Sequence, residues 1–152
     1  MSRNDDDRRW MARAIALSRR CPPSRTAYSV GAILVDADGN EIASGYSRDT
    51  DPHIHAEESA LAKLPPGDPR LARATLYSTL EPCTKRRSRP VPCAELILRA
   101  GVPRVVMAWR EPDLFVTDCT GVETLRAGGV DVVELPDLAA EARQVNGHLQ
   151  FD

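Results

Sequence analysis

The stretch that decides how this chain folds begins at His55-Ala56-Glu57 and continues through Pro82-Cys83 to Pro92-Cys93. A catalytic Zn²⁺ is held by about three nitrogen or sulfur ligands and keeps a fourth position open for water. One imidazole and two thiolates meet this requirement, and the thiolates cancel the charge of the metal. Glu57, two residues after the histidine, can move the protons of a water whose pKa the metal lowers. We therefore predict one Zn²⁺ per chain, held by His55, Cys83 and Cys93, with Glu57 as the catalytic acid and base.

Other interpretations of these residues were weighed. A single cysteine or histidine is most often a packing residue, and a structural zinc site has four protein ligands. The catalytic interpretation is favoured because each ligand lies at a predicted helix start, where the helix dipole stabilises thiolates, and because Glu57 stands at the required offset. His53 has no glutamate two residues later, since position 55 is histidine. It is interpreted as a loop residue or as a residue that contacts the metal ligands without binding the metal.

Composition predicts one globular domain, residues 1–152, with a single sizeable core. Hydrophobic residues make up 42% of the chain and charged residues 28%, and the formal net charge of −2 favours neither nucleic acid nor an anionic membrane as a partner. No apolar run reaches the ~18 residues of a membrane span, and residues 1–7 lack the apolar region of a signal peptide. We expect a cytoplasmic protein with reduced thiols, in which Cys21 and Cys119 are not ligands.

The order of predicted elements indicates an α/β fold. A helix is expected over 5–20, with Asn4 as its cap, and the Asp38-Gly39 turn joins antiparallel strands over 27–35 and 41–46. Further strands over 74–80, 104–109 and 130–135 alternate with helices that start at His55, Cys93, Thr120 (in a capping box with Glu123) and Asp137. This alternation predicts a three-layer α-β-α sandwich around a five-stranded mixed sheet.

Two features of this fold bear on the site. In open sheets of this kind, ligands bind beyond the carboxyl ends of the strands, and here that edge holds the Cys83 loop and residues 110–113. Gly31 marks either a close approach of the backbone to a ligand or a strand bulge. Tyr28 and Trp109 can stack on a heterocycle, but core packing is the preferred interpretation for both.

The motifs resemble those of the cytidine deaminase-like zinc deaminase superfamily, in which His-x-Glu is followed by Pro-Cys and a second cysteine. Nine residues separate Cys83 from Cys93, whereas polynucleotide and tRNA deaminases have two to four. The segments 79–83 (Thr-Leu-Glu-Pro-Cys) and 45–48 (Gly-Tyr-Ser-Arg) are similar to those of the riboflavin-pathway pyrimidine deaminases. The fungal-type diaminohydroxy-ribitylaminopyrimidine phosphate deaminases look nearer than the bacterial deaminase/reductase branch, which has eight residues between the cysteines and Pro-Asn-Pro in place of Thr26-Ala27-Tyr28.

A basic run, Lys85, Arg86, Arg87 and Arg89, lies between two of the predicted ligands. Such a run is either a solvated face or a phosphate site, in which guanidinium groups bind two phosphate oxygens at once. The resemblance points to Arg86 and Ser88, with Lys85, as substrate contacts. It also places Asp113 where relatives have a polar substrate-binding residue.

The resemblance implies hydrolytic deamination of an amino-pyrimidine with release of ammonia. The expected substrate is a phosphorylated riboflavin precursor, a diamino-hydroxy-ribosylamino- or ribitylamino-pyrimidine 5'-phosphate. Alternatives are a deaminase of a free nucleoside or base, such as cytidine, cytosine, guanine or a nucleoside antibiotic, a zinc-binding module without turnover, and a nucleic-acid editor. The resemblance further implies a homodimer or homotetramer and, in the riboflavin pathway, a separate reductase chain.

Overall fold

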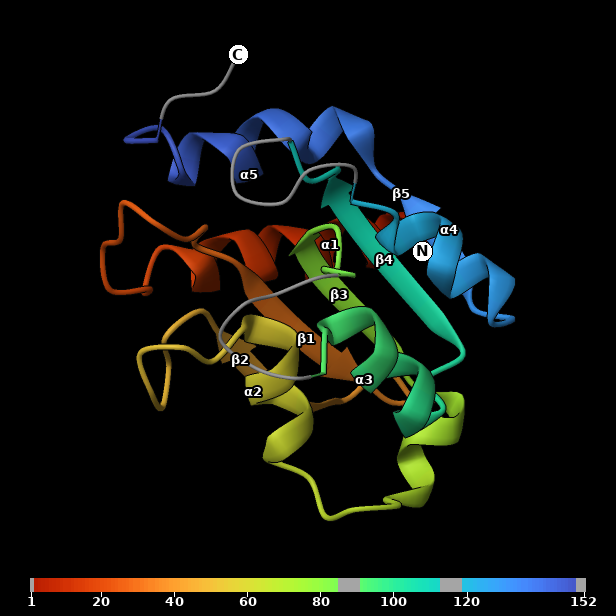
Figure 1. Ribbon diagram of the computed structural model, residues 1–152. Coiled ribbons are helices and arrows are strands. Elements are labelled where there is room, and N and C mark those ends of the chain that lie inside the picture. The colour runs from red at the N-terminus through yellow and green to blue at the C-terminus, as the bar shows by residue number, and fades with distance from the viewer. Residues whose placement is uncertain (1, 85–90, 113–118, 150–152) are drawn as a thin grey trace.

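The computed structural model describes residues 2–84, 91–112 and 119–149. Its centre is a five-stranded sheet in the order β2-β1-β3-β4-β5 (Figure 1). The strands are β1 (Gly31–Val35), β2 (Glu41–Tyr46), β3 (Thr75–Leu80), β4 (Arg104–Trp109) and β5 (Asp131–Glu134). β1 pairs antiparallel with β2 and β3, whereas β3, β4 and β5 run parallel. The predicted mixed sheet, entered through an antiparallel hairpin, is confirmed.

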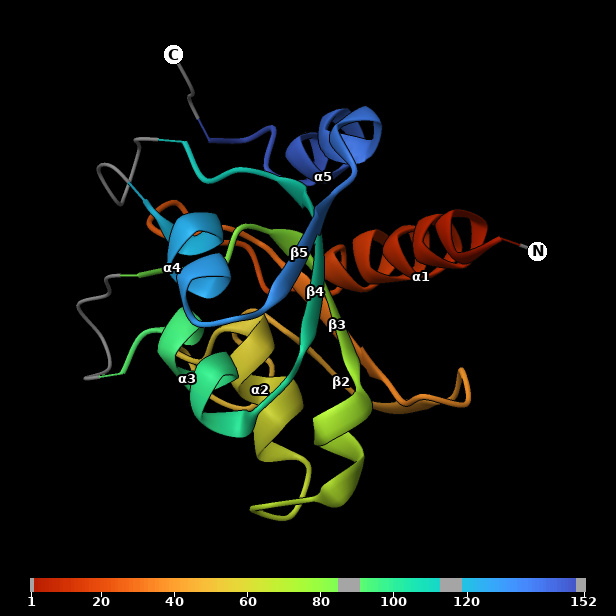
Figure 2. The same ribbon diagram turned by 90° about the vertical axis from the view of Figure 1, so that its right-hand side faces the viewer.

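Helices cover both faces of this sheet. Figure 2 shows α1 (Arg3–Ser18) and α5 (Ala139–Val145) on one side, and α2 (Ala56–Ala62), α3 (Cys93–Ala100) and α4 (Gly121–Ala127) on the other. Two short 3₁₀ helices, η1 (Pro69–Arg73) and η2 (Pro136–Leu138), complete the described elements. The three-layer architecture is therefore the one that the order of elements predicted.

Each face of the sheet has its own hydrophobic cluster. Side chains alternate along a strand, so Ile33 and Val35 of β1 pack under α1, whereas Ala32 and Leu34 pack with α2 and α3. One side of α1 packs on its face of the sheet, and Trp10, Met11, Ala14, Ile15 and Ser18 on that side are all buried. Cys21 is only partly buried, because it lies beyond the end of the helix.

Helix α1 begins earlier than predicted. Its N-cap is Ser2, not Asn4, because the Ser2 hydroxyl accepts the Asp5 N–H at 3.1 Å while the Asp5 carboxylate accepts the Ser2 N–H at 3.3 Å. This reciprocal pair satisfies two N–H groups that the helix itself leaves free. Asn4 instead accepts a hydrogen bond from the Arg8 side chain.

Two other predicted capping interactions are not formed. Thr120 is the N-cap of α4, as predicted, but its side chain makes no capping hydrogen bond, and its backbone (φ −118°, ψ 33°) is not extended as a capping box requires. Asp137 lies inside η2 and pairs with Arg8 of α1, so α5 begins after Leu138 without a side-chain cap. A tertiary contact has therefore taken the place of the local one at Asp137.

Gly31 has a different role from either one predicted. A Cβ atom built there would lie 2.1 Å from the Ala14 carbonyl oxygen, so the residue lets the backbone of α1 approach β1. The register between β1 and β2 shifts only further along, between Leu34 and Val35. Gly31 therefore serves helix packing rather than ligand binding or a bulge.

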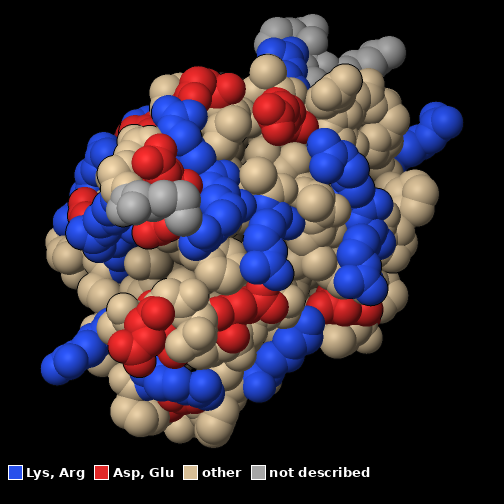
Figure 3. Space-filling view, turned by 180° about the vertical axis from the view of Figure 1, so that it is seen from behind, with Lys and Arg blue, Asp and Glu red and all other residues tan. Residues whose placement is uncertain are grey.

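Lys and Arg side chains are interspersed with Asp and Glu on the face seen in Figure 3.

Across residues 2–84, 91–112 and 119–149, no helix has both the length and the apolar character that crossing a membrane requires.

Candidate active site

Three different elements carry the predicted metal ligands. His55 is the N-cap of α2, and its extended backbone (φ −87°, ψ 160°) is held by a hydrogen bond from its N–H to the Glu58 carboxylate at 3.3 Å. Cys93 is the first residue of α3. Cys83 lies in the loop after β3, so the prediction that every ligand stands at a helix start is wrong for this residue. Since β3 ends at Leu80, this loop lies at the carboxyl edge of the parallel strands, as predicted.

The three side chains converge. The Nδ1 atom of His55 lies 3.6 Å from the Cys83 sulfur and 3.3 Å from the Cys93 sulfur, and all three donor atoms lie within 4.8 Å of one another. Ligands of a tetrahedral zinc, at about 2.0–2.1 Å for nitrogen and 2.3 Å for sulfur, are about 3.5 Å apart. The donor set therefore fits Zn²⁺ in both chemistry and spacing. Both cysteines are buried and His55 is partly exposed.

The two thiols differ in acidity. The hydrogen bond from Cys93, opposed by burial but aided by His55, lowers the pKa of Cys83 to about 4. The Cys93 backbone N–H also donates to the Cys83 sulfur, at 3.3 Å. The contact with Cys83, burial and the nearby Glu57 carboxylate raise the pKa of Cys93 well above its usual value. One proton is thus shared between two sulfurs, and a cation that binds both thiolates must displace it.

Glu57 lies beside this cluster in the first turn of α2. Only 4% of its surface is exposed, and its Oε1 atom lies 2.6 Å from the Ser78 hydroxyl oxygen on β3. Ser78 was not among the predicted site residues. A serine within a buried strand nevertheless indicates a hydrogen-bond partner, because burying a hydroxyl group without one costs free energy. That partner belongs to another element, so no local pattern identifies it.

Glu81 is a second residue that the sequence analysis did not assign to the site. Its carboxylate is buried and accepts the backbone N–H of Glu111 at 3.0 Å and of Val122 at 2.9 Å. The first of these follows β4 and the second lies in α4. Glu81 therefore ties the start of the Cys83 loop to two neighbouring segments at the same edge of the sheet. Gly121 permits this approach, because a Cβ there would lie 2.1 Å from the Pro82 carbonyl oxygen.

Glu111 and Cys119 form a partly buried pair near the cluster. Burial, together with the neighbouring Cys83 and acidic groups, raises the pKa of Glu111 to about 8 despite a hydrogen bond with Cys119. Burial and Glu111 in turn raise the pKa of the Cys119 thiol to about 12. The Cys119 sulfur also contacts the Pro82 carbonyl oxygen, at 3.8 Å. Cys119 thus remains outside the metal cluster, in agreement with its interpretation as a residue that is not a ligand.

The aromatic pair near this edge packs internally. Tyr28 and Trp109 meet edge to face, with ring centroids 5.6 Å apart, and the Tyr28 hydroxyl donates to the Pro112 carbonyl at 3.3 Å. Tyr28 is buried and Trp109 packs against the core, which supports the preferred packing interpretation. His53 lies in an exposed loop, where its N–H donates to the Asp51 carboxylate.

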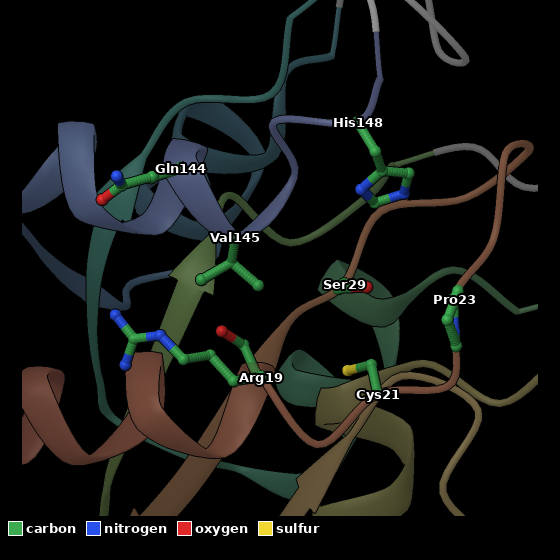
Figure 4. Close-up of a pocket in the computed structure, with 8 residues that line it drawn as sticks. Arg19, Cys21, Pro23, Ser29, Gln144, Val145 and His148 are labelled. Atoms are coloured by element: carbon green, nitrogen blue, oxygen red, sulfur yellow. The ribbon is translucent and has the colours of Figure 1, made fainter.

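Four predicted substrate contacts, Lys85, Arg86, Ser88 and Asp113, lie outside the described residues. A pocket of about 310 Å³ lies elsewhere, between the end of α1, the segment before β1 and the end of α5 (Figure 4). Cys21, Ser29 and His148 are among the residues that line it, and none of the predicted site residues is. The cluster around His55 and this pocket are therefore separate features.

Comparison with known proteins places the chain in a family. Residues 4–109 match the cytidine and deoxycytidylate deaminase zinc-binding region, and the chain belongs to this family. The resemblance inferred from the His55, Cys83 and Cys93 motifs is confirmed, as is the cytidine deaminase-like fold.

Three relatives show which proteins of the family this chain is similar to. A diaminohydroxyphosphoribosylamino-pyrimidine deaminase of Schizosaccharomyces pombe is 39% identical over 127 residues, which are 82% of this chain and 31% of that protein. The crystal structure of the Aspergillus oryzae Rib2 deaminase in complex with DARIPP has a TM-score of 0.79 at 25% identity, over 92% of this chain and 89% of that one. A deaminase/reductase from Thermotoga maritima has a TM-score of 0.78 at 32% identity, over 95% of this chain and 40% of that one. The chain spans about a third of the length of the curated relatives it matches.

Proposed function

We propose that this protein is a zinc-dependent hydrolytic deaminase of an amino-pyrimidine, and that its substrate is a phosphorylated intermediate of riboflavin synthesis. The observation that carries the proposal is the convergence of one imidazole nitrogen and two cysteine sulfurs beside a buried glutamate. The similarity to the Schizosaccharomyces pombe deaminase and to the Aspergillus oryzae enzyme with bound DARIPP supports the substrate class.

In this proposal His55, Cys83 and Cys93 hold the metal. A bound Zn²⁺ supplies a water of lowered pKa and an electropositive centre. Glu57 would take one proton from the attacking water and give it to the ring nitrogen, and would then take the proton of the added hydroxyl group and give it to the departing amine, so ammonia leaves and Glu57 ends the cycle as it began. The burial of Glu57 keeps bulk water from competing for these protons.

Recognition of the phosphate is assigned to the segment between Cys83 and Cys93. Arg86 and Ser88, with Lys85, would contact the phosphate oxygens, since guanidinium and hydroxyl groups give directed hydrogen bonds to phosphate. Asp113 would contact a polar group of the substrate. The segment is bounded by two of the proposed ligands, Cys83 and Cys93, which supports its assignment to substrate binding.

The Thermotoga maritima relative is named as both a deaminase and a reductase, and this chain matches 40% of it. We propose that the product of the deaminase is next reduced by a reductase activity of the same pathway. The proposed assembly of the deaminase is a homodimer or homotetramer, which sedimentation analysis would distinguish from a monomer.

Ammonia release tests the function. Zinc-loaded protein is given the two pathway pyrimidine phosphates, their dephosphorylated forms, cytosine, cytidine, deoxycytidine, its monophosphate and guanine. We expect turnover of a pathway phosphate and little or none of its dephosphorylated form. Turnover of an unphosphorylated base or nucleoside alone would retain the deaminase and reject the riboflavin substrate. Zinc binding without any turnover would reject the enzyme in favour of a binding module.

A further inference from the structure

We propose that Ser78 is a positioning residue for the deamination, whose hydroxyl holds the carboxyl group of Glu57 in one place throughout the reaction cycle. The inference rests on the proposed function for its kinetic consequences. The contact on which it depends is independent of that function.

The hydroxyl of Ser78 has two oxygen neighbours. Its Oγ atom lies 2.6 Å from Oε1 of Glu57 and 2.8 Å from the backbone carbonyl oxygen of Leu80, and the residue is fully buried. A hydroxyl has one proton to donate and lone pairs with which to accept. It can therefore donate to Oε1 of Glu57 both when the carboxyl group is ionised and when the other carboxyl oxygen, Oε2, carries a proton. The heavy atoms stay where they are in both states.

The backbone of Ser78 belongs to the rigid centre of the sheet. Ser78 is paired with Ala32 of β1 on one side and Met107 of β4 on the other. Glu57 is carried by α2, which packs on the same sheet, and its own surface is almost entirely covered. The hydroxyl thus links the acid to the strand from which the Cys83 loop departs. Positioning groups held by packed strands are more precise than groups held by loops.

This arrangement suits a group that must both take and return a proton. Glu57 accepts a proton from water in one step and gives it to the substrate in a later one. Ser78 gains and loses no proton, because the proton that Glu57 exchanges with water and substrate is carried by its other carboxyl oxygen, Oε2. The Oε1 oxygen keeps a hydrogen-bond partner in both states, so the carboxyl group need not move between the steps. A side chain at this position without a hydroxyl would remove this hydrogen bond from the carboxyl group of Glu57.

The test compares Ser78→Ala with the wild type and with Ser18→Ala. Ser18 is an equally buried serine whose hydroxyl donates to a backbone carbonyl, that of Ile15, on the other face of the sheet. We expect Ser78→Ala to keep its zinc content and its KM while kcat falls about 10- to 100-fold, since small misplacement of a reacting group has effects of this size. Ser18→Ala should keep the kcat of the wild type. Ser78→Thr, which restores a hydroxyl, should recover part of the loss.

A second readout does not depend on turnover. Infrared spectra of zinc-loaded protein labelled with ¹³C-glutamate identify the carboxyl band of Glu57 by its absence in Glu57→Gln. We expect this band to shift in Ser78→Ala and to stay in place in Ser18→Ala. An unchanged band, or an unchanged kcat in an active enzyme, would overturn the inference. If the wild type proved inactive on every substrate, the proposed function would fail, whereas the infrared comparison would still decide whether Ser78 holds Glu57.

Discussion

The side-chain amide of Asn146 hydrogen-bonds to both backbone groups of Ser29, which is 117 positions away in the sequence. Its Oδ1 atom accepts the Ser29 N–H at 2.7 Å, and its Nδ2 atom donates to the Ser29 carbonyl at 3.0 Å. Both residues are buried, so the end of α5 gives this segment the pairing that a neighbouring strand would provide. The segment continues through Val30 into β1, whose first residues lie beside the end of β3.

Replacement of Asn146 by alanine should therefore destabilise the protein. The change leaves two buried backbone groups of Ser29 without a partner, and each such group costs about 1–3 kcal/mol. We expect a loss of about 2–4 kcal/mol in the free energy of unfolding, measured by urea denaturation. Gln144→Ala, an exposed change in the same helix, should alter stability by less than about 0.5 kcal/mol. Equal stabilities for the two variants would contradict the stabilising role of the hydrogen bonds between Asn146 and Ser29.

Glu57→Gln should separate chemistry from metal binding. The amide has nearly the same shape as the carboxyl group but cannot accept a proton from water, so turnover should fall by at least about 10²–10⁴-fold. The variant should retain its zinc because the three proposed ligands are unchanged. Glu95→Gln, on the exposed part of α3, is the matched control and should turn over like the wild type. A Glu57→Gln protein with undiminished activity would reject the proposed mechanism.

The zinc content of the purified protein should depend on His55, Cys83 and Cys93 and on neither of the other two cysteines. Purified wild type should contain one zinc per chain, and His55→Ala, Cys83→Ser and Cys93→Ser should each lose most of it because two remaining ligands bind the metal weakly. Cys21→Ser and Cys119→Ser should keep the full amount. Elemental analysis measures the ratio of metal to protein. Loss of zinc from Cys119→Ser would mean that the metal site differs from the one described.

Removal of zinc should also lower the melting temperature. A metal that binds the folded state alone stabilises it, and its removal leaves two buried thiols sharing one proton. We expect excess chelator to shift the calorimetric transition downward, and added Zn²⁺ to reverse the shift. An unchanged transition in protein shown to have lost its zinc would contradict the coupling of metal binding to folding.

A buried ion pair on the far face of the sheet should set the stability at low pH. Burial alone would raise the pKa of Asp7, but hydrogen bonds from Arg104, at 2.6 and 2.8 Å, and from Tyr77, at 2.7 Å, lower it overall. A carboxyl group whose pKa is lower in the folded state than in the unfolded state stabilises the fold above its unfolded value. This stabilisation is lost as the pH falls below about 4.

Asp7→Asn should reduce this dependence on pH and should cost about 3 kcal/mol at pH 7, because the buried Arg104 then keeps only the exposed carboxylate of Asp131, at 3.7 Å, as a counter-ion. Urea denaturation of both proteins between pH 3 and pH 7 measures the effect. Asp6→Asn, a change at a half-exposed position of the same helix, is the control. Parallel stability curves for wild type and Asp7→Asn would contradict the assigned role of Asp7.

Gly31→Ala should destabilise the fold by about 3 kcal/mol or more. The added methyl group would overlap the Ala14 carbonyl oxygen, and neither backbone can move without separating α1 from β1. Gly39→Ala provides the comparison, since that turn residue has a positive φ of 84° but open space around it. Its cost should be smaller, about 1 kcal/mol. Thermal unfolding of the two variants ranks the effects.

Features that depend on neighbouring residues are predictable from the amino-acid sequence alone. The strand and helix order follows from local alternation and from turns such as Asp38-Gly39, and α3 begins at Cys93, as predicted. His55, Cys83, Cys93 and Glu57 were recognisable because the chemistry of a zinc site prescribes their types and the offset between His55 and Glu57. The family assignment drew on the same residues.

The contacts between groups far apart in the chain depend on the packing of the helices on the sheet. Ser78 meets Glu57, Asn146 meets Ser29 and Asp7 meets Arg104 because the packing of helices on the sheet brings them within hydrogen-bond distance. The same packing removed the predicted cap at Asp137, whose carboxylate pairs with Arg8 instead. A buried polar group takes its partner from wherever the fold supplies one, and separation along the chain places no limit on that choice. For this reason the ligands could be read from the sequence, whereas the contacts that hold Glu57 and the segment before β1 in place could not.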